Sequence, residues 1–174
     1  MAKMTTIIEN YNSIRSGIVE LLKTARSATA RNVNSIMTAV YWEIGRRIVE
    51  TEQSGAVRAN YGDELIKQLA KDLSAQFGRG FGVVNLSQMR RFFLAWPTKR
   101  IFQTSSEKSL KPLLFNDIRN NSSSTTILAS HFPLPWSTYV RLLSVKNAEA
   151  RNFYEAEARR SGWSVRQLDR QIGR

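Results

Sequence analysis

The sequence contains no cysteine among its 174 residues, and this absence removes several kinds of chemistry at once. Disulfide bonds, thiol nucleophiles and zinc sites built on thiolates all require cysteine. The chain has a single histidine, His131, so no second histidine exists to join it in a metal cluster. A lone histidine beside a proline-containing turn is more often structural than catalytic. We therefore expect a reducing, cytoplasmic location and no metal or other cofactor.

Long hydrophobic runs are also missing. No apolar stretch is long enough to cross a bilayer, and the N-terminus lacks the continuous apolar segment and cleavage site of a secretory signal. Hydrophobic residues nevertheless make up 42% of the chain, which is ordinary for a globular protein with a core. We expect a soluble globular domain that has no membrane partner.

Signatures of catalysis are scarce. No G-x-S-x-G turn presents a serine nucleophile, and the glycines between residues 78 and 82 lack the G-K-[ST] ending of a phosphate-binding loop. No acidic residue has a lysine two positions later, the E-x-K spacing of one large nuclease class. Glu149 and Glu157 are followed at that distance by arginines. We therefore expect a chain that is not an enzyme, with a metal-dependent nuclease as a distant alternative.

Negative charge is in short supply. Lysine and arginine number 26 against 14 for aspartate and glutamate, which gives a net charge of +12. The excess is local, because residues 79–111 hold one anion, Glu107, and seven cations: Arg79, Arg90, Arg91, Lys99, Arg100, Lys108 and Lys111. Such clustering favours a polyanionic partner, nucleic acid first and an acidic membrane surface or protein second. A solvated basic surface without a partner is the simpler alternative.

The apolar residues recur mostly at helical spacing, so the sequence predicts a mainly α, multi-helical fold of about seven helices. Segments 7–25 and 33–48 are predicted to form an antiparallel pair, with Tyr41 and Trp42 as core aromatics. Further helices are predicted at 63–77, 85–96, 137–143, 147–160 and 165–172. Expected caps are Asn85 with Gln88, Ser137, Asn147, and Ser164 with Gln167, and the expected glycine ends are Gly78 and Gly162.

Composition predicts two small lobes joined by a linker. Residues 98–130 contain polar serine, threonine and asparagine runs without period, which are typical of a flexible connection. The expected domains are an N-terminal helical lobe at 1–97, this linker at 98–130 and a C-terminal helical lobe at 131–174. Strand signals are few, although a small hairpin within 98–130 stays an open alternative.

Each lobe is predicted to contain a unit that resembles a helix-turn-helix. In the first, at 63–96, a glycine turn precedes a helix whose side chains outside the apolar stripe have the chemistry to contact phosphates and base edges. These candidate nucleic-acid-binding residues are Arg79, Ser87, Gln88, Arg90 and Arg91. The alternative is an amphipathic helix that happens to be basic.

The second unit, at 147–173, places Arg166 and Arg170 one turn apart on the helix that follows the Gly162 turn, with Arg159 and Arg160 nearby. Trp163 is expected to be the hydrophobic wedge between the two helices. Surface ion pairs, for example between Arg166 and Asp169, are the alternative for these arginines. We expect this second unit to be the weaker reader of DNA.

Several motifs follow one another along the chain, at 41–48, 52–53, 58–62, 77–81, 85–92, 134–139, 151–154 and 162–172. In this order they resemble the N-terminal domain of the YhcG-type proteins, domain of unknown function 1016, over about residues 7–172. The resemblance implies a bacterial origin and a helical domain that usually precedes a PD-(D/E)xK nuclease domain. The last motif is similar, more loosely, to the helix-turn-helix end of ParB partition proteins.

The chain departs from the family pattern at one motif. Pro135 and Thr138 stand where a Ser-Trp-Ser-His-Tyr motif would place serine and histidine, so any function of that histidine is absent here. We expect the chain to end where the nuclease domain would begin. The sequence as a whole predicts a non-catalytic, nuclease-associated module that binds nucleic acid, DNA before RNA. The alternative is a protein-interaction or dimerisation module that forms a homodimer.

Overall fold

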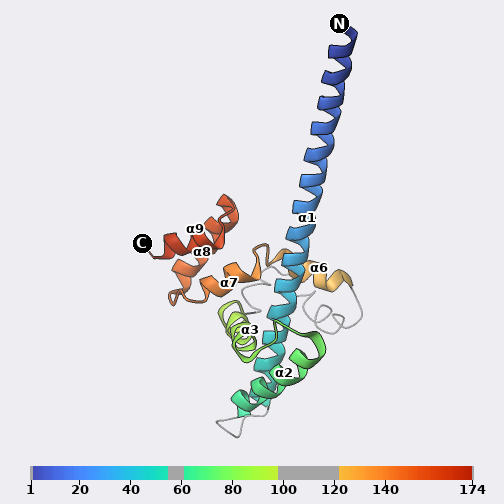
Figure 1. The fold of residues 1–174 in the computed structure, drawn as a ribbon. Coiled ribbons are helices and arrows are strands. Elements are labelled where there is room, and N and C mark those ends of the chain that lie inside the picture. Colours follow the sequence, from blue (N-terminus) through green and yellow to red (C-terminus); the bar gives the residue numbers. More distant parts are fainter. Residues whose placement is uncertain (1, 55–60, 98–121, 174) are drawn as a thin grey trace. The chain divides into compact units, whose positions relative to one another are not determined.

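The computed structural model describes the backbone of residues 2–54, 61–97 and 122–173, and the side chains of 14–53, 62–97 and 125–173. Its described residues form seven helices and no strand, which confirms the mainly α prediction. The chain divides into two compact units, Met1–Val33 and Asn34–Arg174. The first unit is the beginning of helix α1 (Ala2–Ser54), and the second holds the end of α1 and every other described helix (Figure 1).

The predicted antiparallel pair at 7–25 and 33–48 is wrong, because both segments belong to the single helix α1. Residues 26–32 between them contain neither glycine nor proline, so no residue there favours a reversal of the chain. The Thr29 hydroxyl also donates to the Ala25 carbonyl within the same helix, at 3.0 Å. Amphipathic period alone did not distinguish one long helix from two short ones.

One core cluster joins α1 to the next two helices, α2 (Tyr61–Phe77) and α3 (Val83–Ala95) (Figure 1). Its buried members are Ile48, Ile66, Ala70, Leu86 and Met89. Gly45 lets α1 and α3 cross closely, since a Cβ at this position would lie 2.0 Å from the carbonyl oxygen of Met89. The glycine of the 41–48 motif therefore has a packing role.

A larger cluster combines residues from both sides of the predicted linker. Helix α6 (Ser122–Ser130) forms the end of the segment predicted as linker, with Leu128 and Ala129 buried. These residues share a core with Trp42, as predicted for that side chain, and with α3 and the C-terminal helices α7 (Trp136–Leu142), α8 (Ala148–Ser161) and α9 (Val165–Ile172). The described residues of 34–97 and 122–173 thus share one core cluster. Residues 98–121, which hold most of the predicted linker, lie outside the described residues.

The cap predictions hold at α8 and α9 and at both glycine ends. Asn147 caps α8, Ser164 and Gln167 form the capping box of α9, and Gly78 and Gly162 take left-handed φ values of 76° and 63°. Two predicted caps are wrong. Helix α3 begins after Gly82 without a side-chain cap, and α7 begins after Pro135, one residue before Ser137. No described helix is long and apolar enough to span a membrane.

Candidate nucleic-acid interface

The two neighbouring arginines of α3 each donate a hydrogen bond to another part of the fold. Arg90 Nε donates to both carboxylate oxygens of Glu52, at 2.9 and 2.6 Å, and the Glu52 side chain is 15% exposed. Arg91 lies on the exposed side of α3, but its Nη2 donates to the carbonyl of Leu143 just after α7, at 3.1 Å. Arg90 thus fastens α3 to α1, and Arg91 fastens α3 to the end of α7.

The other candidates on α3 offer little to a ligand. Ser87 and Gln88 are half-buried, and the Ser87 hydroxyl donates to the Val83 carbonyl of its own helix at 2.8 Å. The most exposed large side chains of this helix are apolar, with Val84 73% and Leu94 50% exposed. Apart from Arg91, the exposed large side chains of α3 are therefore ones that cannot donate to base edges.

Arg79 lies in the turn between α2 and α3 and is exposed. Gly78 and Gly80 on either side have positive φ, so the turn depends on glycine. The Asn85 side chain holds this turn from α3, because its amide donates to the Gly80 carbonyl and its oxygen accepts from the indole of Trp136. Of the candidate arginines in the α2–α3 unit, Arg79 is the one that is exposed and has no hydrogen-bond partner among the described residues.

The α8–α9 unit is packed against the core by the buried side of α9. Leu168 of α9 is fully buried, and Trp163 and Ile172 pack against the same cluster. The Tyr154 hydroxyl of α8 donates to the Gln171 carbonyl of α9 at 3.2 Å, and Arg141 of α7 forms an ion pair with Asp169. Helices α7 and α8 therefore hold α9 in place, and Trp163 is half-buried at the junction as the sequence predicted.

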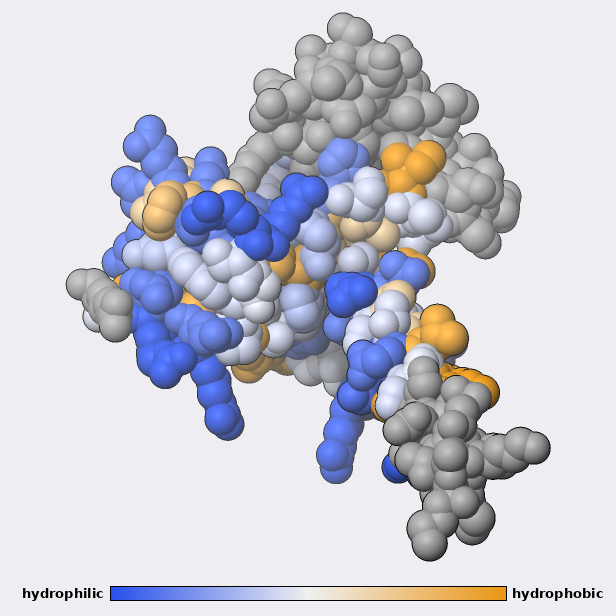
Figure 2. Space-filling view, turned by 90° about the horizontal axis from the view of Figure 1, so that it is seen from above, coloured by the Kyte–Doolittle hydropathy of each residue, from blue (hydrophilic) through white to orange (hydrophobic). Residues whose placement is uncertain are grey.

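The acidic side chains of this unit are largely occupied. Glu155 accepts from the Trp96 indole at 2.8 Å, Glu157 pairs with Arg160 at 2.7 Å, and Asp169 pairs with Arg141. Three arginines of α8 and α9 are exposed and form no ion pair within the described chain: Arg159, Arg166 and Arg170. Figure 2 shows hydrophilic residues gathered over these C-terminal helices, at the left of the view. The result is a pair of helices packed on the core that exposes three arginines without ion pairs among the described residues.

Buried polar contacts connect α8 to the core behind this surface. The Trp42 indole donates to the Trp96 carbonyl at 2.7 Å, and the Arg151 guanidinium lies over the Trp96 ring, 5.1 Å from its centroid. Burial raises the pKa of Tyr139 well above its ordinary value, and the Glu155 carboxylate raises it further. Tyr139 therefore stays neutral, and these contacts orient α8 without supplying a reactive group.

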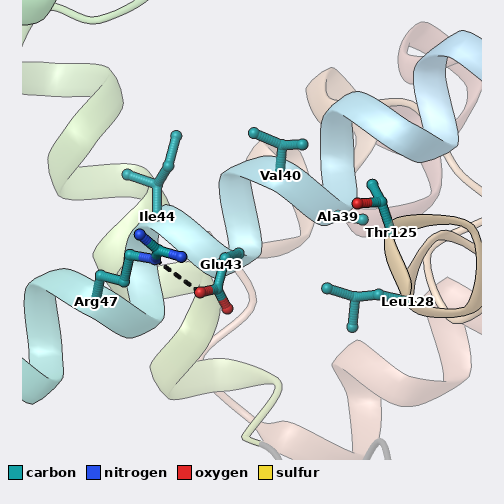
Figure 3. A pocket seen from close by; sticks show the side chains of 7 residues that line it. All are labelled: Ala39, Val40, Glu43, Ile44, Arg47, Thr125 and Leu128. Atoms are coloured by element: carbon teal, nitrogen blue, oxygen red, sulfur yellow. Dashed lines mark hydrogen bonds and ion pairs between the residues drawn. The ribbon is translucent and has the colours of Figure 1, made fainter. Parts of the chain in front are cut away.

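An apolar pocket of about 200 Å³ lies between α1 and α6, lined by Ala39, Val40, Glu43, Ile44, Arg47, Thr125 and Leu128. Figure 3 shows its one carboxylate, Glu43, joined to Arg47. Arg46 also donates to Glu43, and this hydrogen bond raises the pKa of Arg46. The one carboxylate of the pocket is thus already paired with two arginines, Arg46 and Arg47. Among the described residues, no group of three or more histidine, aspartate or glutamate side chains is placed to hold a metal ion.

The sequence motifs and the helical fold point to one family, and the comparison with known proteins decides the matter. The model of the DUF1016 N-terminal domain matches residues 17–174. The chain belongs to this family. Among curated relatives, a protein named "Putative nuclease YhcG" from Escherichia coli (strain K12) is 53% identical over 167 residues. The match covers 93% of this chain and 44% of that relative, so the chain spans less than half of the relative's length. No solved structure matches.

The engagement of Arg90 and Arg91 had no signal in the sequence, because their partners are 38 and 52 residues away. The arginines of α8 and α9, in contrast, lie close together in the sequence, and this clustering is a signal that sequence reasoning could detect. Arg159 belongs with Arg166 and Arg170 because Glu155 and Glu157, its neighbours in sequence, are bound elsewhere. The contacts of the DUF1016 N-terminal domain therefore favour the α8–α9 unit over the α2–α3 unit as the candidate interface.

Proposed function

We propose that this domain binds DNA without cleaving it, and that the α8–α9 unit supplies the main contact. The observation that carries the proposal is that α9 is held by buried and paired side chains while Arg166 and Arg170 are exposed. A guanidinium presented in this way can bind phosphate oxygens at two points without first giving up an internal partner. The net charge of +12 adds long-range attraction.

The role of α3 is revised within this proposal. Arg90 would have to leave Glu52, and Arg91 the Leu143 carbonyl, before either contacted a phosphate. Breaking the Glu52 contact would leave a largely enclosed carboxylate without its partner, which is unfavourable. Arg90 and Arg91 therefore have a structural role in this proposal, because they connect α3 to other helices. Arg79 remains an auxiliary phosphate contact, because it is exposed in a turn. Ser87 and Gln88 are not proposed as direct contacts.

The relative's printed name supports the DNA side of the proposal, since a nuclease acts on nucleic acid. This chain aligns with less than half of that relative, and it lacks the E-x-K spacing. A domain that holds DNA for a separate nuclease domain fits both facts. Purified protein incubated with duplex DNA and magnesium should leave the DNA intact, and reproducible cleavage that co-purifies with the chain would contradict the non-catalytic part.

Fluorescence anisotropy with a labelled duplex, repeated over a range of salt concentrations, tests DNA binding. Phosphate contacts release counterions, so the affinity should fall steeply with salt. Replacing Arg166 and Arg170 together by alanine should weaken binding by roughly tenfold or more and reduce the slope of log Kd against log salt by about 2, close to one unit for each lost contact.

The matched control replaces Arg15 and Arg26 by alanine, because both are exposed and their loss changes the net charge equally. This variant should keep most of the affinity and nearly the full salt slope. Equal weakening by both double variants would mean that the net charge, and not the α8–α9 surface, determines binding. A wild-type affinity that is independent of salt would overturn the proposal. Parallel titrations with single-stranded RNA compare the two nucleic acids.

A further inference from the structure

The compact unit Met1–Val33 exposes a row of large apolar side chains among its described residues. The exposed fractions are large for the bulkiest of its side chains: Ile14 64%, Ile18 50%, Leu21 72% and Leu22 53%. The sequence predicted that segment 33–48 would fold back to cover this surface, but that segment continues the same helix. Apolar patches of this kind on a helix are typical of interaction sites.

The spacing of these residues is that of a coiled coil. From Ile14 the apolar positions follow in alternating steps of four and three, through Ile18, Leu21, Ala25 and Ala28. This is the 3.5-residue period of a heptad seam. Ile14, Leu21 and Ala28 take the d positions, and Ile18, Ala25 and Asn32 take the a positions. The same steps extend in the sequence to Tyr11 and Ile7.

We propose that this part of α1 pairs with the α1 helix of a second copy of the chain, as a parallel, in-register, two-stranded coiled coil. Asn32 is the observation that selects this partner. An asparagine at a single a position faces its own symmetry mate in a parallel pair, and the two amides hydrogen-bond across the seam. In an antiparallel pair, a positions face d positions, so Asn32 would oppose an apolar side chain.

The rest of the seam agrees with two strands. Ile18 at an a position, next to Leu21 at a d position, is the combination that favours parallel dimers. Ala25 and Ala28 follow as small core residues, which let two helices approach each other closely. Because Asn32 is exposed, its amide is accessible for the pairing.

The flanking charges permit two identical helices to meet, although the whole chain is strongly basic. In the parallel register each g position faces the following e position of the other helix, so Gly17 faces Leu22 and Thr24 faces Thr29. Arg15 and Arg31 are the cations beside the seam within residues 14–33, and neither faces the other or its own symmetry mate. Lys23 and Arg26 occupy f and b positions, away from the seam.

Single cysteines test the register directly, because the natural chain contains none. Ile14→Cys, Leu21→Cys and Ala28→Cys each place a thiol at a d position, where two copies meet in a parallel pair. All three full-length variants should form disulfide-linked dimers under mild oxidation, and Ser16→Cys at an outer f position should not. An antiparallel pair would cross-link efficiently at no more than the one position nearest its centre, and that pattern would overturn the parallel register.

The mass of the full chain in solution, measured by light scattering across micromolar concentrations without DNA, tests the association itself. The wild type should be a dimer. Ile18→Asp with Leu21→Asp should be a monomer, because four carboxylates would meet in the seam. The control, Ser16→Asp with Ala30→Asp, adds the same charge at f positions and should remain a dimer.

Both pairs of positions are exposed, so circular dichroism should report folded protein for each variant. A monomeric wild type, or equal dimerisation of the two double variants, would overturn the proposal. Because neither the cross-linking nor the mass measurement involves nucleic acid, their failure leaves the proposed DNA binding untouched, and the failure of DNA binding leaves them untouched.

Discussion

The α2–α3 and α8–α9 units share one plan and use their arginines differently. Each consists of two helices joined by a turn that contains a left-handed glycine, Gly78 in one and Gly162 in the other. In α3 the arginines bind Glu52 and the Leu143 carbonyl, whereas in α9 the exposed Arg166 and Arg170 make no such contacts within the described chain. A basic helix is therefore a candidate ligand surface only after its internal acceptors have been counted.

The packing of the two second helices explains the difference. Three residues of α3, Leu86, Met89 and Phe92, are fully buried, and they divide between the two core clusters. Helix α9 buries one leucine fully, Leu168. A helix surrounded by neighbours finds internal partners for its polar groups, and a helix at the margin of the core leaves its outer side to solvent.

The largest predicted effect concerns the close crossing of α1 and α3, which packs the α2–α3 unit into the core. Gly45→Ala should lower the free energy of unfolding by about 3 kcal/mol or more, because the new methyl group would collide with the Met89 backbone and force the helices apart. Chemical denaturation measures the effect. Gly17→Ala is the matched control on the same helix, where a Cβ meets nothing within 4 Å and alanine should stabilise by up to about 1 kcal/mol. A small effect at Gly45 would mean that the crossing is adaptable.

The sequence predicted several elements that depend on neighbours in the chain, although Asn85 turned to Gly80 and Trp136 instead of capping α3. The Asn147 cap, the Ser164–Gln167 capping box and the Gly162 end all close within a few residues, so their physics is readable locally. The glycine-free and proline-free stretch 26–32 also carried the information that α1 is continuous. A helical period that continues through such a stretch is compatible with one long helix.

The candidate site was less predictable, because its composition depends on distant partners. A sequence pattern places Arg90 outside the apolar stripe of its helix, but only the fold brings Glu52 to it from 38 residues away. The clustering of cations at 79–111 favoured the α2–α3 unit because the sequence does not show which of these cations have internal partners. The α8–α9 surface is detectable once the partners of Glu155, Glu157 and Asp169 are known.

The next largest effect comes from comparing alanine variants of two arginines, one in α3 and one in α9. Arg90→Ala should lower the free energy of unfolding by about 1–2 kcal/mol, because it leaves the mostly enclosed Glu52 carboxylate unsatisfied. It should change DNA affinity little. Arg166→Ala should leave stability within about 0.5 kcal/mol of the wild type, as expected for an exposed side chain, and weaken DNA binding by about half, on a logarithmic scale, of the loss in the double variant. Denaturation and anisotropy on both variants check this crossed pattern, and a stable Arg90→Ala protein with lost affinity would return α3 to the interface.

The smallest predicted effect concerns how α9 is started. Ser164→Ala should cost about 1 kcal/mol, because the hydroxyl accepts from the Gln167 amide and completes the capping box. Since α9 has only eight residues, this loss should appear first as faster hydrogen exchange of its amides, followed by a modest loss of DNA affinity as Arg166 becomes less fixed. Ser137→Ala is the control, because α7 begins after Pro135 and the Ser137 side chain does not cap it. If both serines behave alike, the start of α9 is held by Trp163 and Leu168 packing instead of by its cap, and the rigidity of the arginine surface comes from the core alone.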